Sequence, residues 1–379
     1  MIDNERQTPV LVLTGFLGAG KSTVLRRLLC APEFANSGVI VNEFGDVAVD
    51  HDLVAAGLPQ VAVTSTGCLC CTAGSDIRAT VAELHEAARK AGRLPLDRVV
   101  VETTGLADMA PVVNQLVAGA VPAFGLRDHT VARNYRLAGV VTLFDAVEGI
   151  GTLDRHDECV KQVAFADRVL VSKLDCVPTA EREDRLAEVT TLVRRLNPRV
   201  PVEDLHATGF DPAAAFAPRA YAPQDLGSDL ADWLEEGPTD AHAGHAHHDH
   251  DHDHHHHHDA RNSDGSYGIG SFAIVREGPV DKDALARVLD LVNLFHGPNL
   301  LRLKGLVAFA DEPETPYVIQ VVQHVVHPLR RLDAWPGPDR RTRLVAITHG
   351  IDPAALERMM TTMLDGDTTH TSPPERIAL

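Results

Sequence analysis

The chain has 379 residues, which is long for one domain and enough for two, and 44% of them are hydrophobic, which excludes a wholly disordered protein. The formal net charge of -18 argues against binding to nucleic acid or to an anionic membrane, because phosphate contacts need a basic surface. The 6 cysteines are too few for a disulfide scaffold, and no segment reaches the ~20 apolar residues of a membrane span. We therefore expect a cytoplasmic protein.

The first half of the chain alternates apolar runs with helical stretches. Continuous apolar runs are typical of strands that are buried on both faces of a sheet. The pattern therefore predicts an α/β domain with a mostly parallel sheet over residues 1–222. Its expected strands cover residues 9–14, 38–41, 60–63, 98–101, 139–144 and 168–171, and its expected helices include 22–29, 77–91 and 179–196.

The composition changes after residue 222. Residues 223–266 begin with a stretch rich in proline and acidic residues, and residues 242–258 hold 11 of the 21 histidines with three aspartates. The second stretch has no apolar residue larger than alanine, so it cannot form a core. We expect residues 223–266 to be a flexible linker that carries a histidine tract.

Regular patterns resume in residues 267–365, which we predict to form a smaller α+β domain. Residues 301–309 largely alternate between apolar and polar side chains, as in a half-buried strand. Residues 366–379 are expected to be a frayed tail. The expected strands are 269–275, 300–309, 317–324 and 343–348, and the expected helices are 281–295 and 353–364.

A glycine-rich motif follows the first predicted strand. Residues 15–22 read GFLGAGKS and match G-x-x-x-x-G-K-[ST] in full, between a strand and a helix start. In such a P-loop the main-chain N–H groups and the helix N-terminus surround phosphates, the lysine reaches the β- and γ-phosphates, and the hydroxyl binds Mg²⁺. The alternative is a glycine-rich turn with a chance lysine. The expected nucleotide-binding residues here are Gly15, Gly18, Ala19, Gly20, Lys21, Ser22 and Thr23.

Two further strand ends complete the predicted nucleotide site. Glu102 ends an apolar strand where a P-loop protein needs an acid for its Mg²⁺, and Gly105 follows. We expect Lys21, Ser22 and Glu102 to be the catalytic residues, with Ser22 and Glu102 as the magnesium site, and Gly105 to contact the nucleotide.

A polar turn follows the strand at residues 168–171. Asp175 would accept hydrogen bonds from N1 and N2 of guanine, which adenine lacks, and Lys173 would pack over the base. Ser172 stands where this motif usually has asparagine or threonine. The alternative is a polar surface turn; the interpretation we follow is selection of GTP by Ser172, Lys173 and Asp175.

Three thiols lie within four positions, at Cys68, Cys70 and Cys71. Thiolates suit Zn²⁺, and also Cu(I) or Co²⁺. Glu43 follows the second strand, where P-loop GTPases carry a moving switch, so it is a candidate metal ligand. Asp128 and His129 lie in a loop-like stretch and either would approach the thiols, although a solvated loop is the simpler reading. Isolated Cys30, Cys159 and Cys176 are expected to be ordinary packing residues.

These motifs resemble the CobW-type GTPases, a P-loop family of the SIMIBI class that contains metallochaperones. The resemblance implies a cytoplasmic GTPase with a CobW-type C-terminal domain that binds a transition metal, usually zinc and sometimes cobalt. It implies coupled binding of metal and Mg-GTP, with hydrolysis releasing the metal to a client protein. Cys70 and Glu43 are the strongest ligand candidates by resemblance, followed by Cys68 and Cys71. The matching segments are GFLGAGKST (15–23), NEFGDVAVD (42–50), GCLCC (67–71), ETTGLAD (102–108), SKLD (172–175), KGLVAF (304–309), QHVVHPLRRLDAWP (323–336) and DRRTRLVAITHGID (339–352).

The histidine tract adds a hypothesis of its own. Imidazoles bind Zn²⁺, Ni²⁺, Cu²⁺ and Co²⁺, so the tract, with His242 and His254 as candidate ligands, would collect metal near the thiols. The alternative is a linker with no metal role. Three other functions stay open: a cobalt chaperone for cobalamin synthesis, a P-loop kinase or ligase, and a passive histidine-rich metal buffer.

Overall fold

The computed structural model describes residues 7–41, 61–63 (main chain only), 77–117, 120, 125–198, 200–217, 268–336 and 339–366. Its first part is built on a seven-stranded sheet of order β3-β2-β4-β1-β5-β6-β7, in which all neighbouring strands are parallel. The strands are β1 (Thr8–Gly15), β2 (Ser37–Val41), β3 (Val61–Val63), β4 (Arg98–Glu102), β5 (Tyr135–Asp145), β6 (Arg168–Ser172) and β7 (Val202–Asp204).

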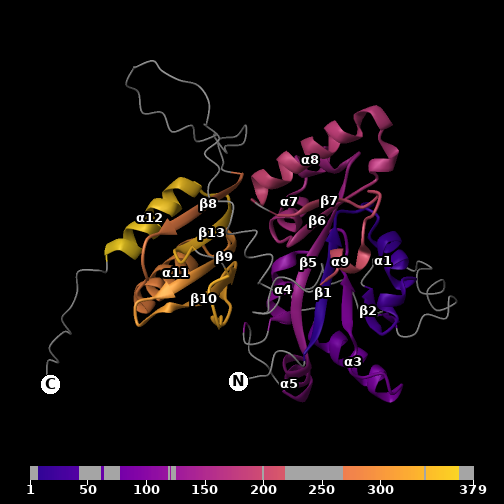
Figure 1. Ribbon diagram of the computed structural model, residues 1–379, viewed down its shortest axis with the longest axis horizontal. Coiled ribbons are helices and arrows are strands. Elements are labelled where there is room, and N and C mark those ends of the chain that lie inside the picture. The colour runs from indigo at the N-terminus through magenta and orange to yellow at the C-terminus, as the bar shows by residue number, and fades with distance from the viewer. Residues whose placement is uncertain are drawn as a thin grey trace.

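Helices cover both faces of this sheet, as Figure 1 shows. Alternate residues of the central strands enter two cores: Val10 and Val12 pack with α3 and α4, whereas Leu11 and Leu13 pack with α1 and α9. This is the doubly wound arrangement, and it confirms the predicted α/β fold class. The α-helices are α1 (Lys21–Leu29), α3 (Ile77–Lys90), α4 (Met109–Leu116), α5 (Gly125–Asn134), α6 (Gly149–Leu153), α7 (Asp157–Ala164), α8 (Arg182–Leu196) and α9 (Pro212–Ala215), and the 3₁₀ turns are Pro32–Phe34, Leu174–Cys176 and Thr179–Glu181.

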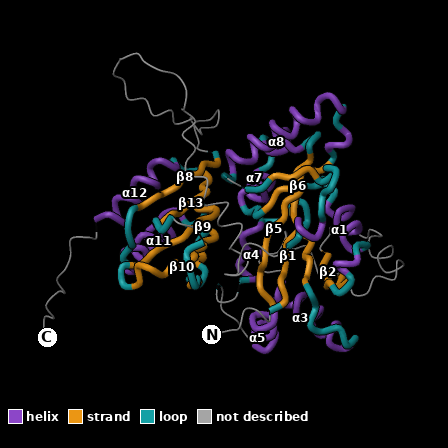
Figure 2. Tube along the Cα trace, viewed as in Figure 1, coloured by secondary structure: helices purple, strands orange, loops and turns teal. Residues whose placement is uncertain are grey.

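The second part is the predicted α+β unit, an antiparallel sheet of order β11-β10-β9-β13-β8 in which β12 also pairs with β10. Its helices pack together and on the sheet, so that Leu285, Val288 and Met360 enclose one core with residues of β9 and β13. Figure 2 shows this unit on the left of the molecule, with its helices in purple and its strands in orange. The elements are β8 (Ile269–Arg276), α11 (Lys282–His296), β9 (Leu300–Phe309), β10 (Glu312–Val322), β11 (Val325–Val326), β12 (Arg330–Arg331), β13 (Thr342–His349) and α12 (Pro353–Gly366).

Some element bounds differ from the sequence expectations. Strand β10 begins five residues earlier than expected, at Glu312. It ends at Val322 because Gln323 takes the left-handed conformation (φ 51°) and turns the chain. Helix α8 begins at Arg182 because Thr179–Glu181 first forms a 3₁₀ turn after Pro178. The predicted linker at 223–266 with its histidine tract, and residues 367–379 of the predicted tail, lie outside the described residues, so the proposed domain boundaries stay a prediction. Among the described helices, none is long and apolar enough to cross a membrane.

The C-terminal sheet packs against α4 of the first part through an apolar contact. Leu301 of β9, Val322 of β10 and Ile347 of β13 belong to the same buried cluster as residues of α4. Beside this cluster, Nε2 of His327 is 3.1 Å from Oδ1 of Asn114 on α4. Burial, together with the nearby cations of the C-terminal unit, lowers the pKa of His327 to about 3, so the imidazole is neutral at physiological pH. Because Oδ1 of Asn114 is an acceptor, Nε2 carries the ring proton and donates to it.

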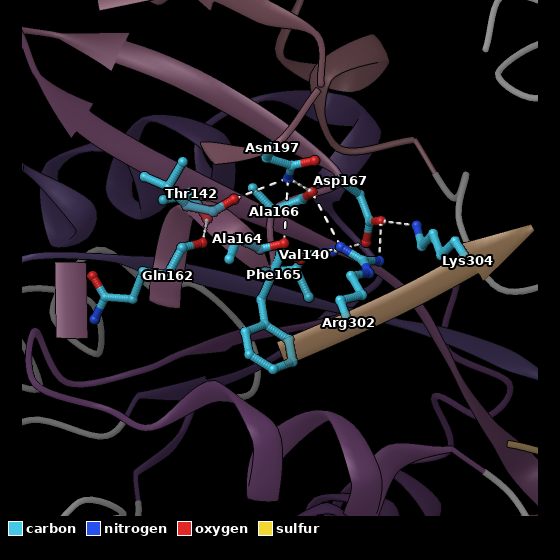
Figure 3. A network of polar contacts seen from close by, with 11 residues as sticks. Val140, Thr142, Gln162, Ala164, Phe165, Ala166, Asp167, Asn197, Arg302 and Lys304 are labelled. Atoms are coloured by element: carbon cyan, nitrogen blue, oxygen red, sulfur yellow. Dashed lines mark hydrogen bonds and ion pairs between the residues drawn. The ribbon is translucent and has the colours of Figure 1, made fainter. Parts of the chain in front are cut away.

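Polar contacts at the end of α7 complete this junction (Figure 3). Asp167 accepts a hydrogen bond from the main-chain N–H of Val140, and it pairs with Arg302 at 2.6 Å and Lys304 at 2.5 Å, both on β9. Burial alone would raise the pKa of the Asp167 carboxyl, but the charges of Arg302 and Lys304 outweigh it and lower that pKa. The carboxylate therefore stays ionised in the junction at neutral pH.

We expect Asp167→Asn to lower the free energy of unfolding by about 3 kcal/mol at pH 7, because it removes the buried carboxylate charge that faces Arg302 and Lys304. The pKa of Asp167 is depressed in the folded chain, so its contribution is present above its unfolded value of about 4 and is lost as pH falls through the folded value. Urea unfolding of the full chain at pH 7 and pH 3.5 should show the difference between wild type and variant shrinking in acid.

The control is Asp311→Asn, which removes an exposed carboxylate that pairs with Lys282 at 2.7 Å. Its effect on the free energy of unfolding should be much smaller than that of Asp167→Asn at pH 7 and should change little with pH, since exposed pairs contribute little. Equal effects of the two substitutions would contradict the assignment of Asp167 as a buried, ionised partner of β9.

Candidate functional site

The glycine-rich loop runs from the end of β1 into the first turn of α1. Gly18 (φ 78°) and Gly20 (φ 94°) have left-handed backbone conformations, which residues with a Cβ rarely adopt. Gly15 ends β1 and Ala19 is buried, with its N–H donating to the Phe16 carbonyl at 3.2 Å. The loop therefore closes tightly and delivers the chain to a helix N-terminus, where main-chain N–H groups have no helical acceptor.

The side chains in the first turn of α1 differ in their burial and in their contacts. Lys21 is 9% exposed, and its Nζ donates to the Gly15 carbonyl at 2.9 Å and to the Phe16 carbonyl at 3.2 Å. Its ammonium group therefore lies against the loop itself. Thr23 is exposed. The predicted lysine therefore contacts the glycine-rich loop, and its binding of phosphate stays a prediction.

Ser22 and Glu102 meet at the carboxyl edge of the sheet. The Ser22 hydroxyl donates to Oε1 of Glu102 at 2.8 Å, and Glu102 is only 2% exposed at the end of β4. A hydroxyl beside a carboxylate is a set of hard oxygen ligands of the kind that Mg²⁺ takes, usually with waters and phosphate oxygens. The donor set therefore fits a divalent cation held together with an anion in the adjacent loop.

Gly105 approaches the glycine-rich loop closely. A Cβ at this position would lie 2.5 Å from the main-chain nitrogen of Leu17, a distance that real Cβ atoms do not show. The segment before it is fixed by a buried hydrogen bond of 2.8 Å from Thr103 to Thr14. The structure thus brings the two predicted loops into direct main-chain contact.

Ser172 joins the third predicted loop to the first. Its hydroxyl donates to the carbonyl of Ala19 at 2.8 Å, with the carbonyl of Phe144 at 3.3 Å, and the side chain is 3% exposed. A short hydroxyl therefore ties the β6 end to the glycine-rich loop. The departure from asparagine or threonine at this position leaves a connection between the loops in place.

Lys173 and Asp175 are positioned by residues that the sequence analysis did not select. Lys173 is in the left-handed conformation (φ 57°), and its Nζ pairs with Asp145 at 2.6 Å. Nε2 of His206 is 3.2 Å from Oδ1 of Asp175, and Arg182 donates to the Asp175 carbonyl at 2.8 Å. The carboxylate of Asp175 is 55% exposed, so it is held in place while remaining accessible.

Asp145 could have been selected from the sequence as a candidate site residue. It is a carboxylate directly at the end of an apolar strand, like Glu102. His206 follows the short strand β7, which the sequence analysis did not predict, so its approach to Asp175 depends on tertiary structure alone.

The predicted metal residues Glu43, Cys68, Cys70, Cys71, His242 and His254 lie outside the described residues. Within the described part of the chain, no group of three or more histidine, cysteine, aspartate or glutamate side chains is arranged to hold a metal ion. Cys159 is buried, which raises its thiol pKa to about 12, whereas Cys30 and Cys176 are exposed.

The expectation of a loop-like stretch around residues 128–129 was wrong. Both residues lie in α5, where Asp128 pairs with Arg78 at 3.5 Å and His129 is exposed. Helix α5 is mostly polar and Val131 is its buried residue, so the sequence of this helix has no apolar stripe from which a helix could be predicted.

Comparison with known proteins gives matches over both parts of the chain. The model described as "CobW/HypB/UreG, nucleotide-binding domain" matches residues 9–203, and the one described as "Cobalamin synthesis protein cobW C-terminal domain" matches residues 269–364. The chain is 30% identical to the zinc chaperone YjiA of Escherichia coli, over 80% of this chain and 83% of that protein. It is 29% identical to the zinc chaperone CobW of a Sinorhizobium species, over 95% of this chain and 98% of that protein.

A solved structure supports the same fold. The crystal structure of the Zn(II)-bound YjiA GTPase from Escherichia coli has a TM-score of 0.60, at 22% identity, and the match covers 94% of this chain and 99% of that chain.

We expect Ser172→Ala to lower the free energy of unfolding by about 1–2 kcal/mol, because the Ala19 carbonyl loses a buried hydrogen bond. The matched control is Ser37→Ala on β2, since the Ser37 hydroxyl is also buried and has no hydrogen-bond partner among the described residues. Urea unfolding of both variants measures the difference, and an equal loss in the two would refute the connection between the loops.

Proposed function

Because this chain belongs to the CobW/HypB/UreG family of nucleotide-binding proteins, we propose that it is a GTP-hydrolysing metallochaperone that binds zinc and delivers it to a client protein. The observation that carries the proposal is the hydrogen bond between Ser22 and Glu102, a hydroxyl–carboxylate pair at the mouth of an intact P-loop. The names of the relatives, zinc chaperones in Escherichia coli and Sinorhizobium, support zinc as the cargo.

The P-loop binds the triphosphate in this proposal. Main-chain N–H groups from Gly15 to Thr23 surround the phosphate oxygens, and the Lys21 ammonium exchanges its contacts with the Gly15 and Phe16 carbonyls for the β- and γ-phosphates. Mg²⁺, when bound, neutralises charge that develops on the phosphates. Ser22 and Glu102 are the residues that would hold it, and Gly105 lies at the γ-phosphate side of the loop.

Guanine selectivity is assigned to Asp175. Its carboxylate accepts hydrogen bonds from N1 and N2 of the base, Lys173 covers the base with its stem, and Ser172 ties this turn to the P-loop. His206 and Arg182 fix the turn from outside, which limits the reorganisation needed when the nucleotide binds.

The zinc cargo is assigned to Cys68, Cys70 and Cys71 with Glu43, on the basis of the sequence and the family. Thiolates are the preferred soft ligands of Zn²⁺, and Glu43 follows β2, whose C-terminal end lies at the same edge of the sheet as Glu102. The histidine tract, including His242 and His254, supplies weaker sites that gather metal in the cytoplasm. GTP and zinc must favour the same state of the protein, and hydrolysis then loosens the metal.

The test is a zinc titration of the full chain with GTPγS, with GDP and without nucleotide. We expect zinc to bind at least tenfold more tightly with GTPγS, and zinc to tighten GTPγS binding by the same factor, as linkage requires. Equal zinc affinities in all three states would overturn the proposal. A parallel titration with Co²⁺ in competition decides between zinc and the cobalt alternative.

Variants assign the parts of the site. Replacing Cys68, Cys70 and Cys71 with serine should abolish tight zinc binding, whereas serine at the exposed Cys30 and Cys176 should leave it unchanged. Deletion of residues 242–258 should reduce only the number of weak sites. Lys21→Ala should remove GTP hydrolysis. If the wild-type chain transfers phosphate to an added small molecule and does not release it, the protein is a kinase.

Nucleotide selectivity provides a separate prediction. Asp175→Asn should weaken GTP binding roughly 100-fold, because two charge-assisted hydrogen bonds to the base are lost, and should improve binding of XTP. The control is Asp184→Asn, an exposed carboxylate in the first turn of α8. Calorimetric titrations with GTP, XTP and ATP measure the change, and an unaltered order of affinities would remove Asp175 from the guanine site.

A further inference from the structure

Helix α7 carries a fully buried glutamine next to the nucleotide site. The exposed fraction of Gln162 is 0%, and its Nε2 donates to the carbonyl of Gly105 at 3.0 Å. The main-chain carbonyl of Gln162 accepts a hydrogen bond from Thr142 at 2.8 Å, which fixes this turn of α7 on β5. The other amide atom, Oε1, is buried and has no hydrogen-bond partner among the described residues.

A buried amide with one unsatisfied end is an unusual choice for packing alone. An apolar side chain of similar length would fill the same space without leaving an acceptor unpaired. The gain from glutamine is its donor, which holds the carbonyl of Gly105. Because Gly105 also presses against the main chain of Leu17, this glycine lies between the P-loop on one side and α7 on the other.

The C-terminal end of the same helix is held by the other domain (Figure 3). Arg302 of β9 donates to the carbonyls of Phe165 at 2.6 Å and Ala166 at 3.2 Å, immediately after α7, and it pairs with Asp167. From within the first domain, Nδ2 of Asn197 contacts the carbonyls of Val163, Ala164 and Ala166 at 2.8–3.3 Å.

These contacts suit the end of a helix. A cation is favourable at a helix C-terminus, where the last carbonyls have no partner within the helix and carry partial negative charge. Arg302 supplies that charge from β9, which belongs to the C-terminal domain. The position of the C-terminal domain is therefore fixed in part by contacts of Arg302 with the end of α7.

We propose that Gln162 is a positioning residue for Gly105, and that α7 couples the nucleotide site to the seating of the C-terminal domain through Arg302. The proposal rests on the proposed GTP site, in which Gly105 lies by the γ-phosphate. Only one helical turn separates Gln162 from Phe165, so α7 transmits a displacement of Gly105 without flexible chain between the two contacts.

The thermodynamic content is a linkage. A state in which Gly105 contacts the γ-phosphate also fixes Gln162, α7 and the carbonyls that Arg302 holds. GTP and a seated C-terminal domain then favour the same state, and weakening either contact lowers the affinity for GTP more than the affinity for GDP. A purely structural glutamine or arginine would change stability and leave this preference alone.

The first test is Gln162→Met in the full chain, which keeps the length of the side chain and removes the donor together with the unpaired acceptor. We expect the ratio of the dissociation constants of GDP and GTPγS to fall about tenfold, because one buried hydrogen bond to Gly105 is lost. The urea midpoint should fall less than in Ser172→Ala, because the loss of the hydrogen bond is partly offset by removal of the unpaired buried acceptor. Calorimetric titrations with GTPγS and GDP, in the presence of Mg²⁺, measure the ratio.

The second test is Arg302→Met, with Arg302→Lys as the conservative variant. Lysine keeps the charge but has no planar fork to reach two carbonyls and a carboxylate, so we expect both variants to lower the same ratio by about three- to tenfold. Circular dichroism and the urea transition establish that each variant is folded. The matched control is Arg340→Met, which removes an exposed cation of the same domain that pairs with Glu314 and should leave the ratio unchanged.

The double variant Gln162→Met with Arg302→Met decides the coupling. If α7 joins the two contacts, the combined fall in the ratio is no larger than the greater single effect. Multiplying single effects, or a ratio within twofold of wild type in both folded arginine variants, would overturn the coupling. A wild-type chain that binds neither guanine nucleotide would instead refute the proposed function on which the inference stands.

Discussion

The parallel order β4-β1-β5-β6 is the constraint on which the candidate site depends. In this register Leu13 lies beside Glu102, Gly15 beside Leu143, and Asp145 beside Ser172, so four strands end along one edge of the sheet. Parallel strands bring their carboxyl ends together and leave the connecting helices on the two faces. Loops that are far apart in the sequence therefore meet, and hydrogen bonds from Ser22 to Glu102 and from Ser172 to Ala19 join them.

Burial gives these few hydrogen bonds their weight. Glu102, Ser172 and Gln162 are each at most 3% exposed, so a lost partner is not replaced by water. The contacts to Ala19 and Gly105 are made to main-chain carbonyls, which fixes the loop backbone directly. A backbone held in this way is already organised for a ligand that is recognised mainly by N–H groups, and less of the binding free energy is lost in ordering the loop.

How much the sequence predicts follows from how local each signal is. The fold class, the strand that ends at Glu102 and the loop before Lys21 are set by contiguous residues, and these patterns predicted the observed elements. Strand β7 has one apolar residue in three and forms by pairing with β6, so no local pattern announces it. Gln162 looks like an ordinary polar residue of a helix, because its partner Gly105 is 57 positions away.

The junction between the domains uses charge where a larger apolar contact would give greater stability. Burying Asp167 with Arg302 and Lys304 costs desolvation that their attraction only partly offsets, and apolar side chains of similar volume are often at least as stabilising. An apolar contact such as the one between Val322 and α4 tolerates sliding, whereas a carboxylate that takes two cations and a main-chain N–H is satisfied in one arrangement. The junction thus defines how β9 sits on α7, and a domain with one defined seat is able to report the state of the helix beneath it.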